Sequence, residues 1–250
     1  MNILLLNPNT TQALTDRMAR VASAAASAGT RIEPVTATRG VPYISTRAEA
    51  QIAGAIALEI LAERRAAVDG VIMAAFGDPG LGAAREMLEI PVVGMAEAAM
   101  LTACMLGRRF AIVTFARALE PWFQECVEAN GLAHRCAGVQ CATGAFSSID
   151  AVQAEMEERL VETALACLDA LRPDVIILAG APLSGLAPVI RDRVPVPLVD
   201  GVVAAVKQIE GLVAQKPRKA QAGSFRKPAG KMSQGLAPAL AQWLRDDRPA

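Results

Sequence analysis

The sequence predicts an α/β protein of two pseudo-symmetric lobes, each a mostly parallel sheet flanked by helices, with an active-site cleft between the lobes. Three observations support this fold class. Short apolar runs alternate with long amphipathic segments, which is typical of parallel α/β folds. The second half of the chain repeats motifs of the first. The 250 residues are 53% hydrophobic and 20% charged, which is enough to bury a core.

The sequence pattern predicts four strands and four helices in the first half of the chain. Gly29 can end the first helix, because glycine readily adopts the left-handed conformation found just after helices. Thr46 and Glu49 have the spacing of a capping box, which predicts the start of the second helix. The predicted strands are residues 2–6, 31–36, 70–75 and 91–93, and the predicted helices are residues 11–28, 46–67, 81–88 and 96–106.

The same succession then starts again. Strands are predicted at residues 110–114, 135–141, 174–179 and 197–199, and helices at residues 118–130, 149–171 and 202–213, with a short helix before the last strand. The segment 215–231 is basic, and residues 235–244 can form a final helix. We therefore expect a lobe at 1–107, a second lobe at 108–213 and a basic loop with a helix at 214–250, with or without a crossing of the chain between lobes.

An internal repeat relates the two halves. The segment 69–81 matches 174–186 without a gap, and Asn7 corresponds to Thr114 at the end of each first strand. Similarity between any two strand–turn–helix units is the alternative, but the matching turns and following strands favour a repeat. Because ligands bind beyond the carboxyl ends of parallel strands, the repeat predicts one cleft between the ends at Asn7, Ala75, Thr114 and Gly180.

Composition excludes several other classes of protein. Lys plus Arg and Asp plus Glu are 25 each, and this zero net charge argues against nucleic-acid binding. No apolar run approaches the ~20 residues of a membrane span, and no signal peptide is recognisable. The five cysteines lack C-x-x-C spacing and there is one histidine, so neither a disulfide framework nor a metal site is expected. Reduced thiols predict a cytoplasmic protein.

Five motifs together resemble the aspartate/glutamate racemase superfamily, in particular its hydantoin and allantoin racemase branch. The resemblance covers residues 1–213 and implies a cofactor-independent isomerase, a small-molecule substrate with a carboxylate or imide group, and a homo-oligomer. The motifs are Asn7-Pro8-Asn9-Thr10-Thr11, Ala74-Ala75-Phe76-Gly77-Asp78-Pro79-Gly80-Leu81, Gly94-Met95-Ala96-Glu97-Ala98-Ala99, Val113-Thr114-Phe115 and Gly180-Ala181-Pro182-Leu183-Ser184-Gly185-Leu186.

The resemblance also implies where the chemistry takes place. In this superfamily two cysteines at the ends of the repeat-related strands exchange an α-proton on opposite faces of the substrate. The matching positions here are Ala75 and Gly180, so both thiols are absent. Neither residue titrates, so the two-thiol mechanism does not transfer. Asp78, the nearest carboxylate to Ala75, is a candidate acid or base, although Asp-Pro-Gly is also ordinary turn chemistry.

The candidate substrate-binding residues lie at the same strand and helix ends. The helix starting near Thr10 is expected to have free N–H groups that favour a carboxylate or imide oxygen, whereas plain helix capping is the alternative. The candidates are Asn7, Pro8, Asn9, Thr10, Thr46, Phe76, Thr114, Phe115 and Ala181.

Three functions fit this pattern. The first is a racemase acting on a hydantoin, allantoin or related amino-acid derivative. The second is a decarboxylase or other enolate-forming lyase on the same scaffold. The third is a small-acid binding protein without catalysis. All three predict the same pocket and differ in whether a proton-transferring group points into it.

Overall fold

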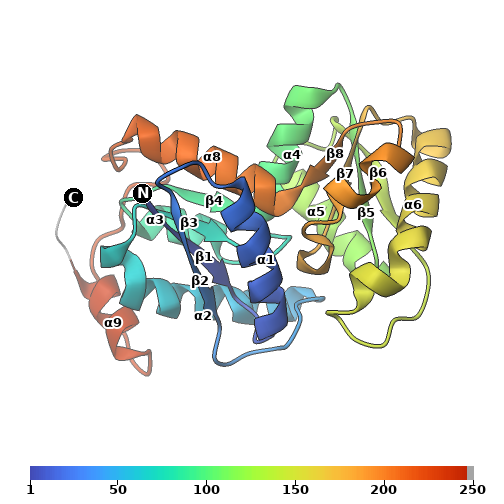
Figure 1. The fold of residues 1–250 in the computed structure, drawn as a ribbon. Helices are drawn as coiled ribbons and strands as arrows, with labels where there is room; N and C mark the ends of the chain where they lie inside the picture. The colour runs from blue at the N-terminus through green and yellow to red at the C-terminus, as the bar shows by residue number, and fades with distance from the viewer. Residues whose placement is uncertain (247–250) are drawn as a thin grey trace.

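The computed structural model describes residues 1–246, so residues 247–250 of the predicted C-terminal segment lie outside the described part. Two four-stranded parallel sheets form two lobes that lie side by side (Figure 1). The first sheet has the order β2-β1-β3-β4, with strands Arg31–Thr36, Asn2–Asn7, Gly70–Met73 and Val92–Gly94. The second has the order β6-β5-β7-β8, with strands Cys136–Cys141, Phe110–Thr114, Val175–Leu178 and Leu198–Asp200. The identical order confirms the predicted pair of pseudo-symmetric lobes.

The helices occupy the predicted segments, with bounds that differ by a few residues. Within the described residues they are α1 (Gln12–Ala25), α2 (Arg47–Arg64), α3 (Leu81–Met87), α4 (Met95–Leu106), α5 (Glu120–Ala129), α6 (Val152–Leu171), α7 (Ala187–Ile190), α8 (Gly201–Gln215) and α9 (Pro238–Arg245). Short 3-10 turns accompany them at Arg65–Ala67, Arg117–Leu119, Ala181–Leu183 and Arg191–Arg193. None of the helices in residues 1–246 is long and apolar enough to cross a membrane.

The last helix of each lobe covers the sheet of the other lobe. Helix α4 follows β4 but packs against β7 and β8, whereas α8 follows β8 and packs against β3 and β4. The two helices also pack against each other between the lobes (Figure 1). Gly201 permits this close approach, because a Cβ at that position would stand 2.8 Å from Cγ of Met95. The boundary predicted at residues 107 and 108 falls between α4 and β5 and stays a prediction.

Strand register places the repeat-related residues at equivalent points. Leu6 pairs with Met73 in the first sheet, and Val113 pairs with Leu178 in the second. The N–H of Ala74 then donates to Leu6 O at 2.8 Å, and that of Ala179 donates to Val113 O at 2.9 Å. The strands predicted to reach residues 75 and 179 therefore end at 73 and 178, and the chain turns directly afterwards.

The sheets are buried on both faces, as expected for parallel strands covered by helices. In β1, Ile3 and Leu5 point into a large apolar cluster that extends across both lobes, whereas Leu4 and Leu6 point into a second cluster. The second cluster includes the buried Trp243 of α9, a helix that packs on α2. The C-terminal segment is thus folded back onto the first lobe.

Candidate active site

Residues that follow the repeat-related strands belong to one apolar cluster that extends across both lobes. Ala75 and Phe76 after β3 and Phe115 after β5 are buried members of this cluster. The ring of Phe76 lies 4.7 Å, centroid to centroid, from that of Phe123 in the other lobe. Ala181, which begins the 3-10 turn after β7, is buried in the same cluster. Ala75, Phe76, Phe115 and Ala181 are thus all buried members of this cluster, and their convergence on one substrate pocket stays a prediction.

Gly180 adopts a backbone conformation that favours glycine. Its φ is +114°, where side chains other than glycine are strained. A Cβ at this position would stand 2.8 Å from Cε1 of Phe115 and 3.5 Å from the hydroxyl oxygen of Tyr43. An aromatic ring and a phenol thus lie against the position at which the resemblance implies a second thiol.

The Asn-Pro-Asn-Thr turn forms hydrogen bonds within the protein. Nδ2 of the buried Asn7 donates to Asn9 Oδ1 at 3.0 Å and to Thr15 Oγ1 at 2.9 Å. Asn9 Oδ1 also accepts from the N–H of Thr11, and the N–H of Thr10 donates to Val41 O at 3.0 Å. The N–H groups of Thr10 and Thr11 are therefore already paired within the protein, and binding of a substrate oxygen at the start of this helix stays a prediction. Pro8 lies buried inside this turn.

Two threonines that are candidate substrate ligands form hydrogen bonds within the protein. Thr46 caps α2: its Oγ1 accepts from the N–H of Glu49, whose carboxylate accepts from the N–H of Thr46 in return. The buried Thr114 donates through Oγ1 to Ala179 O at 3.2 Å, which ties β5 to the turn after β7. Each hydroxyl therefore already has a partner within the protein. The assignment of Thr46 and Thr114 as substrate ligands stays a prediction.

Sequence reasoning missed Tyr43. This residue lies in the loop between β2 and α2, yet its ring packs 5.9 Å from that of Phe115 in the other lobe. The signal available in the sequence was weak. Tyr43 is the one tyrosine of the chain and lies between Pro42 and the buried Ile44.

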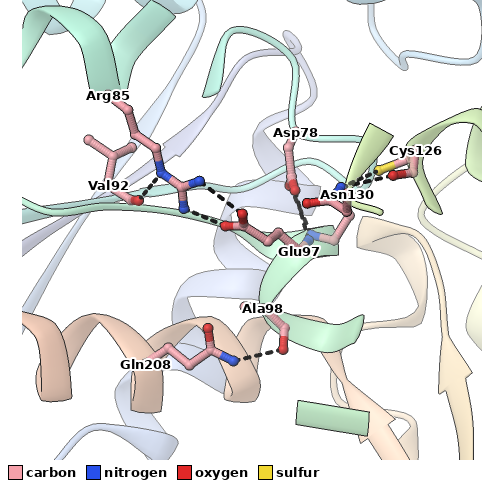
Figure 2. Close-up of polar contacts among 9 residues, drawn as sticks. Asp78, Arg85, Val92, Glu97, Ala98, Cys126, Asn130 and Gln208 are labelled. Atoms are coloured by element: carbon pink, nitrogen blue, oxygen red, sulfur yellow. Dashed lines mark hydrogen bonds and ion pairs between the residues drawn. The ribbon is translucent and has the colours of Figure 1, made fainter. Parts of the chain in front are cut away.

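Asp78 anchors the start of α4. Its Oδ1 accepts from the N–H of Ala96 at 2.8 Å. Its Oδ2 accepts from the N–H of Glu97, also at 2.8 Å (Figure 2). Glu97 is in turn held by the guanidinium of Arg85. Burial raises the pKa of Asp78 to about 7 despite the two backbone donors. The carboxylate thus has a structural role, and its assignment as an acid or base stays a prediction.

The second lobe has an equivalent contact. There the carboxylate lies at the end of the last strand instead of in the turn after the third strand. Asp200 at the end of β8 accepts from the N–H groups of Val202 and Val203 at the start of α8. It also accepts from the N–H of Gly185 in the turn after β7, at 2.6 Å. Both lobes therefore use a buried aspartate to join the turn after the third strand to the final helix.

The raised pKa of Asp78 predicts a pH-dependent stability. Because the folded state binds this proton more tightly than the unfolded chain, wild-type protein should lose stability relative to Asp78→Asn as pH rises from about 4 to about 7. Above pH 7 the difference should level off. Urea titrations of both proteins at several pH values measure it, and a constant difference across this window contradicts the raised pKa.

An open cavity of about 720 Å³ adjoins the Asp78 turn. Two interacting charge pairs line it, Arg47 with Glu125 and Arg85 with Glu97. Phe225 from the basic C-terminal segment also lines the cavity, so this segment reaches the same region of the molecule.

Burial disfavours the thiolate form of Cys126, Cys141 and Cys167. Cys126 lines the cavity near Asn130 (Figure 2), but burial raises the pKa of its thiol. Burial likewise raises the pKa of Cys141 and of Cys167 to about 11. These thiols remain protonated at neutral pH, and protonated thiols are poor nucleophiles and bases. Within residues 1–246 no group of three or more His, Cys, Asp or Glu side chains could hold a metal ion.

Two parallel α/β lobes of equal strand order, which pack on each other through α4 and α8, define the fold class of this protein. The model of the family described as Asp/Glu/Hydantoin racemase matches residues 3–209. The chain therefore belongs to the Asp/Glu/hydantoin racemase family and is an isomerase.

Similar proteins extend over nearly the whole chain. A hydantoin racemase of Paenarthrobacter aurescens is 31% identical over 233 residues, which are 92% of this chain and 99% of that protein. The structure of an allantoin racemase from Klebsiella pneumoniae has a TM-score of 0.90 at 33% identity and covers 96% of this chain and 98% of its own. An allantoin racemase from Pseudomonas fluorescens has a TM-score of 0.86 at 30% identity and covers 94% of this chain and 100% of its own. These relatives do not favour a decarboxylase or a non-catalytic binding protein.

Proposed function

We propose that this isomerase racemises a hydantoin or a related cyclic ureide by removing and returning the proton beside the ring carbonyl. Sequence identity of 31% to a hydantoin racemase over nearly the whole chain is the observation that carries this proposal. The surroundings of Gly180 support it. Phe115 and Tyr43 lie against this position and Ala181 follows it, and these side chains suit a compact, uncharged ring better than a dicarboxylate.

The same proposal accounts for a site without thiols. The proton beside the carbonyl of a hydantoin is already fairly acidic, so its removal needs less help than the α-proton of a free amino acid. Stabilising the enolate then becomes the main task of the protein. A free amino acid would need both of the missing proton carriers.

Further properties belong to this proposal. We propose that the enzyme works without a cofactor and in the cytoplasm, where its five free cysteines would stay reduced. We also propose a homo-oligomer that does not bind nucleic acid. Exposed Leu101, Met105 and Leu106 on α4 support self-association, and the zero net charge supports the absence of nucleic acid. Light scattering after gel filtration tests the oligomeric state.

Proton NMR in heavy water tests the reaction. We expect solvent deuterium to replace the α-proton of 5-monosubstituted hydantoins, with loss of optical rotation at a matching rate. Aspartate and glutamate serve as controls and should exchange far more slowly. Exchange confined to the amino acids, or release of CO₂ from a carboxylic acid, would show that the substrate class is wrong.

A further inference from the structure

The Tyr43 hydroxyl lies at the carboxyl end of the second sheet, although its loop belongs to the first lobe. It stands 3.5 Å from the point that a Cβ on Gly180 would occupy. It makes no hydrogen bond to any residue in the described part of the chain, and no side-chain oxygen there is both buried and unpaired. The hydroxyl therefore has no protein partner among the described residues and can donate to a ligand.

The loop that carries Tyr43 is held in place on both sides. The N–H of Thr10 donates to Val41 O at 3.0 Å, and Oγ1 of Thr11 donates to Pro42 O at 2.6 Å. On the far side, the N–H of Ser45 donates to the Glu49 carboxylate at 2.7 Å. The Asn-Pro-Asn-Thr-Thr turn thus positions the tyrosine loop, and a donor fixed in advance needs no reorganisation during a reaction.

The surroundings make this hydroxyl a donor rather than a base. Burial raises the pKa of Tyr43 above its ordinary value, so the phenol keeps its proton at neutral pH. Phe115 and Gly180, which lie beside Tyr43, carry no charge. In such an apolar setting a hydrogen bond to an oxygen that gains negative charge is strengthened.

Resting on the proposed function, we infer that Tyr43 donates a hydrogen bond to the ring carbonyl oxygen that becomes negative when the α-proton leaves. The α C–H bond breaks, its electron pair passes into the carbonyl to form an enolate, and water takes the proton. Water returns a proton to either face of the enolate, which yields the racemised ring. Stabilisation of the enolate by Tyr43 thereby takes the place of proton transfer by two thiols.

The variant Tyr43→Phe tests this inference because it removes only the hydroxyl and keeps the ring that packs on Phe115. We expect the exchange rate of a 5-monosubstituted hydantoin to fall by about 10²-fold, the effect of losing one such donor. Affinity for 5,5-dimethylhydantoin, which has no α-proton, should fall by only about 3–10-fold. The larger loss in rate distinguishes stabilisation of the enolate from simple binding.

A packing control accompanies this variant. Phe146 lies 5.8 Å from Phe115 in the same aromatic cluster, so Phe146→Leu perturbs the packing but leaves the hydroxyl. It should change exchange and affinity by similar factors. Because the chain has one tyrosine, 3-fluorotyrosine labelling gives a single fluorine signal, which should shift when 5,5-dimethylhydantoin binds.

The outcomes separate the inference from the proposed function. If wild-type protein neither binds 5,5-dimethylhydantoin nor exchanges any hydantoin, the proposed function fails and the inference fails with it. If wild-type protein binds or exchanges and Tyr43→Phe does so equally well, the inference alone is overturned. A loss of exchange in Tyr43→Phe no greater than its loss of affinity also overturns it.

Discussion

Replacing Ala75 with cysteine is expected to raise the rate of α-proton exchange on a hydantoin by about 10²–10⁴-fold, the contribution of one positioned acid or base. Ala75 occupies the same place after β3 as Gly180 occupies after β7. It does not have the positive φ that would make a side chain strained there. Proton NMR in heavy water measures the rate for Ala75→Cys and wild-type protein side by side.

The matched control is Ala75→Ser, which adds a side chain of similar shape without an acidic thiol. It should stay within a few-fold of the wild-type rate. Iodoacetamide should abolish the gain in Ala75→Cys, because the thiolate is the reactive form. A folded Ala75→Cys protein that binds 5,5-dimethylhydantoin but gains no rate would show that residue 75 does not face the reacting carbon.

The second thiol is harder to restore. At Gly180 a cysteine would need a strained backbone with φ of +114°, and its Cβ would stand only 2.8 Å from a carbon of Phe115. The double variant Ala75→Cys with Gly180→Cys is therefore a poor test of two-thiol chemistry, since a loss of folding would hide it. Tyr43 offers a better partner: adding Tyr43→Phe to Ala75→Cys should remove much of the gain.

Sequence patterns predicted the elements well because each element depends on local chemistry. The capping box at Thr46 and Glu49 forms as expected at the start of α2. The strand predicted over 70–75 was too long, because the apolar run continues after β3 has lost its sheet partner at Met73. A run of apolar residues indicates that a segment is buried, but not that it is a strand. Residues in the turn after β3 are buried as well.

No local feature of the sequence indicated that α4 and α8 each pack on the sheet of the other lobe. Periodicity shows that one face of α4 is buried, but it does not show whether the partner is its own sheet or the other. The contacts of α4 with β7 and β8 are decided by the whole arrangement. The possibility that the chain crosses between lobes was therefore left open by the sequence.

The candidate site shows the same division between local and long-range information. The resemblance located Ala75 and Gly180, because motifs align residue by residue. Tyr43 was missed because its contact with Phe115 joins two lobes across a long stretch of chain. The hydrogen bonds that Asn7 and Thr10 make within the protein had no signal, because free and satisfied donors look alike in a sequence.

The contacts of Asp78 and Asp200 also explain why the last strand ends in glycine in one lobe and in aspartate in the other. Gly94 at the end of β4 corresponds in the repeat to Asp200 at the end of β8. In the second lobe the strand end supplies the carboxylate, so the turn after β7 supplies only the N–H of Gly185. In the first lobe the turn supplies Asp78, so the strand end must leave room for it. Glycine at 94 is therefore required by the carboxylate at 78.

Gly94→Ala is expected to lower the free energy of unfolding by about 3 kcal/mol, because displacing the Asp78 carboxyl group breaks its two buried hydrogen bonds to the N–H groups of Ala96 and Glu97. An added Cβ would stand 2.3 Å from both Cγ and Oδ2 of Asp78. The φ of −86° at Gly94 suits any residue, so the cost is steric. Urea unfolding measures it.

The matched control for this substitution is Gly82→Ala in α3, where an added Cβ meets nothing within 4 Å. Alanine there should stabilise the protein by up to about 1 kcal/mol, since glycine disfavours a helix interior. In the double variant Asp78→Ala with Gly94→Ala the clash is gone, so the total loss should be well below the sum of the two single losses. Additive losses would mean that the carboxylate and Gly94 do not depend on each other, and that the asymmetry between the lobes has another cause.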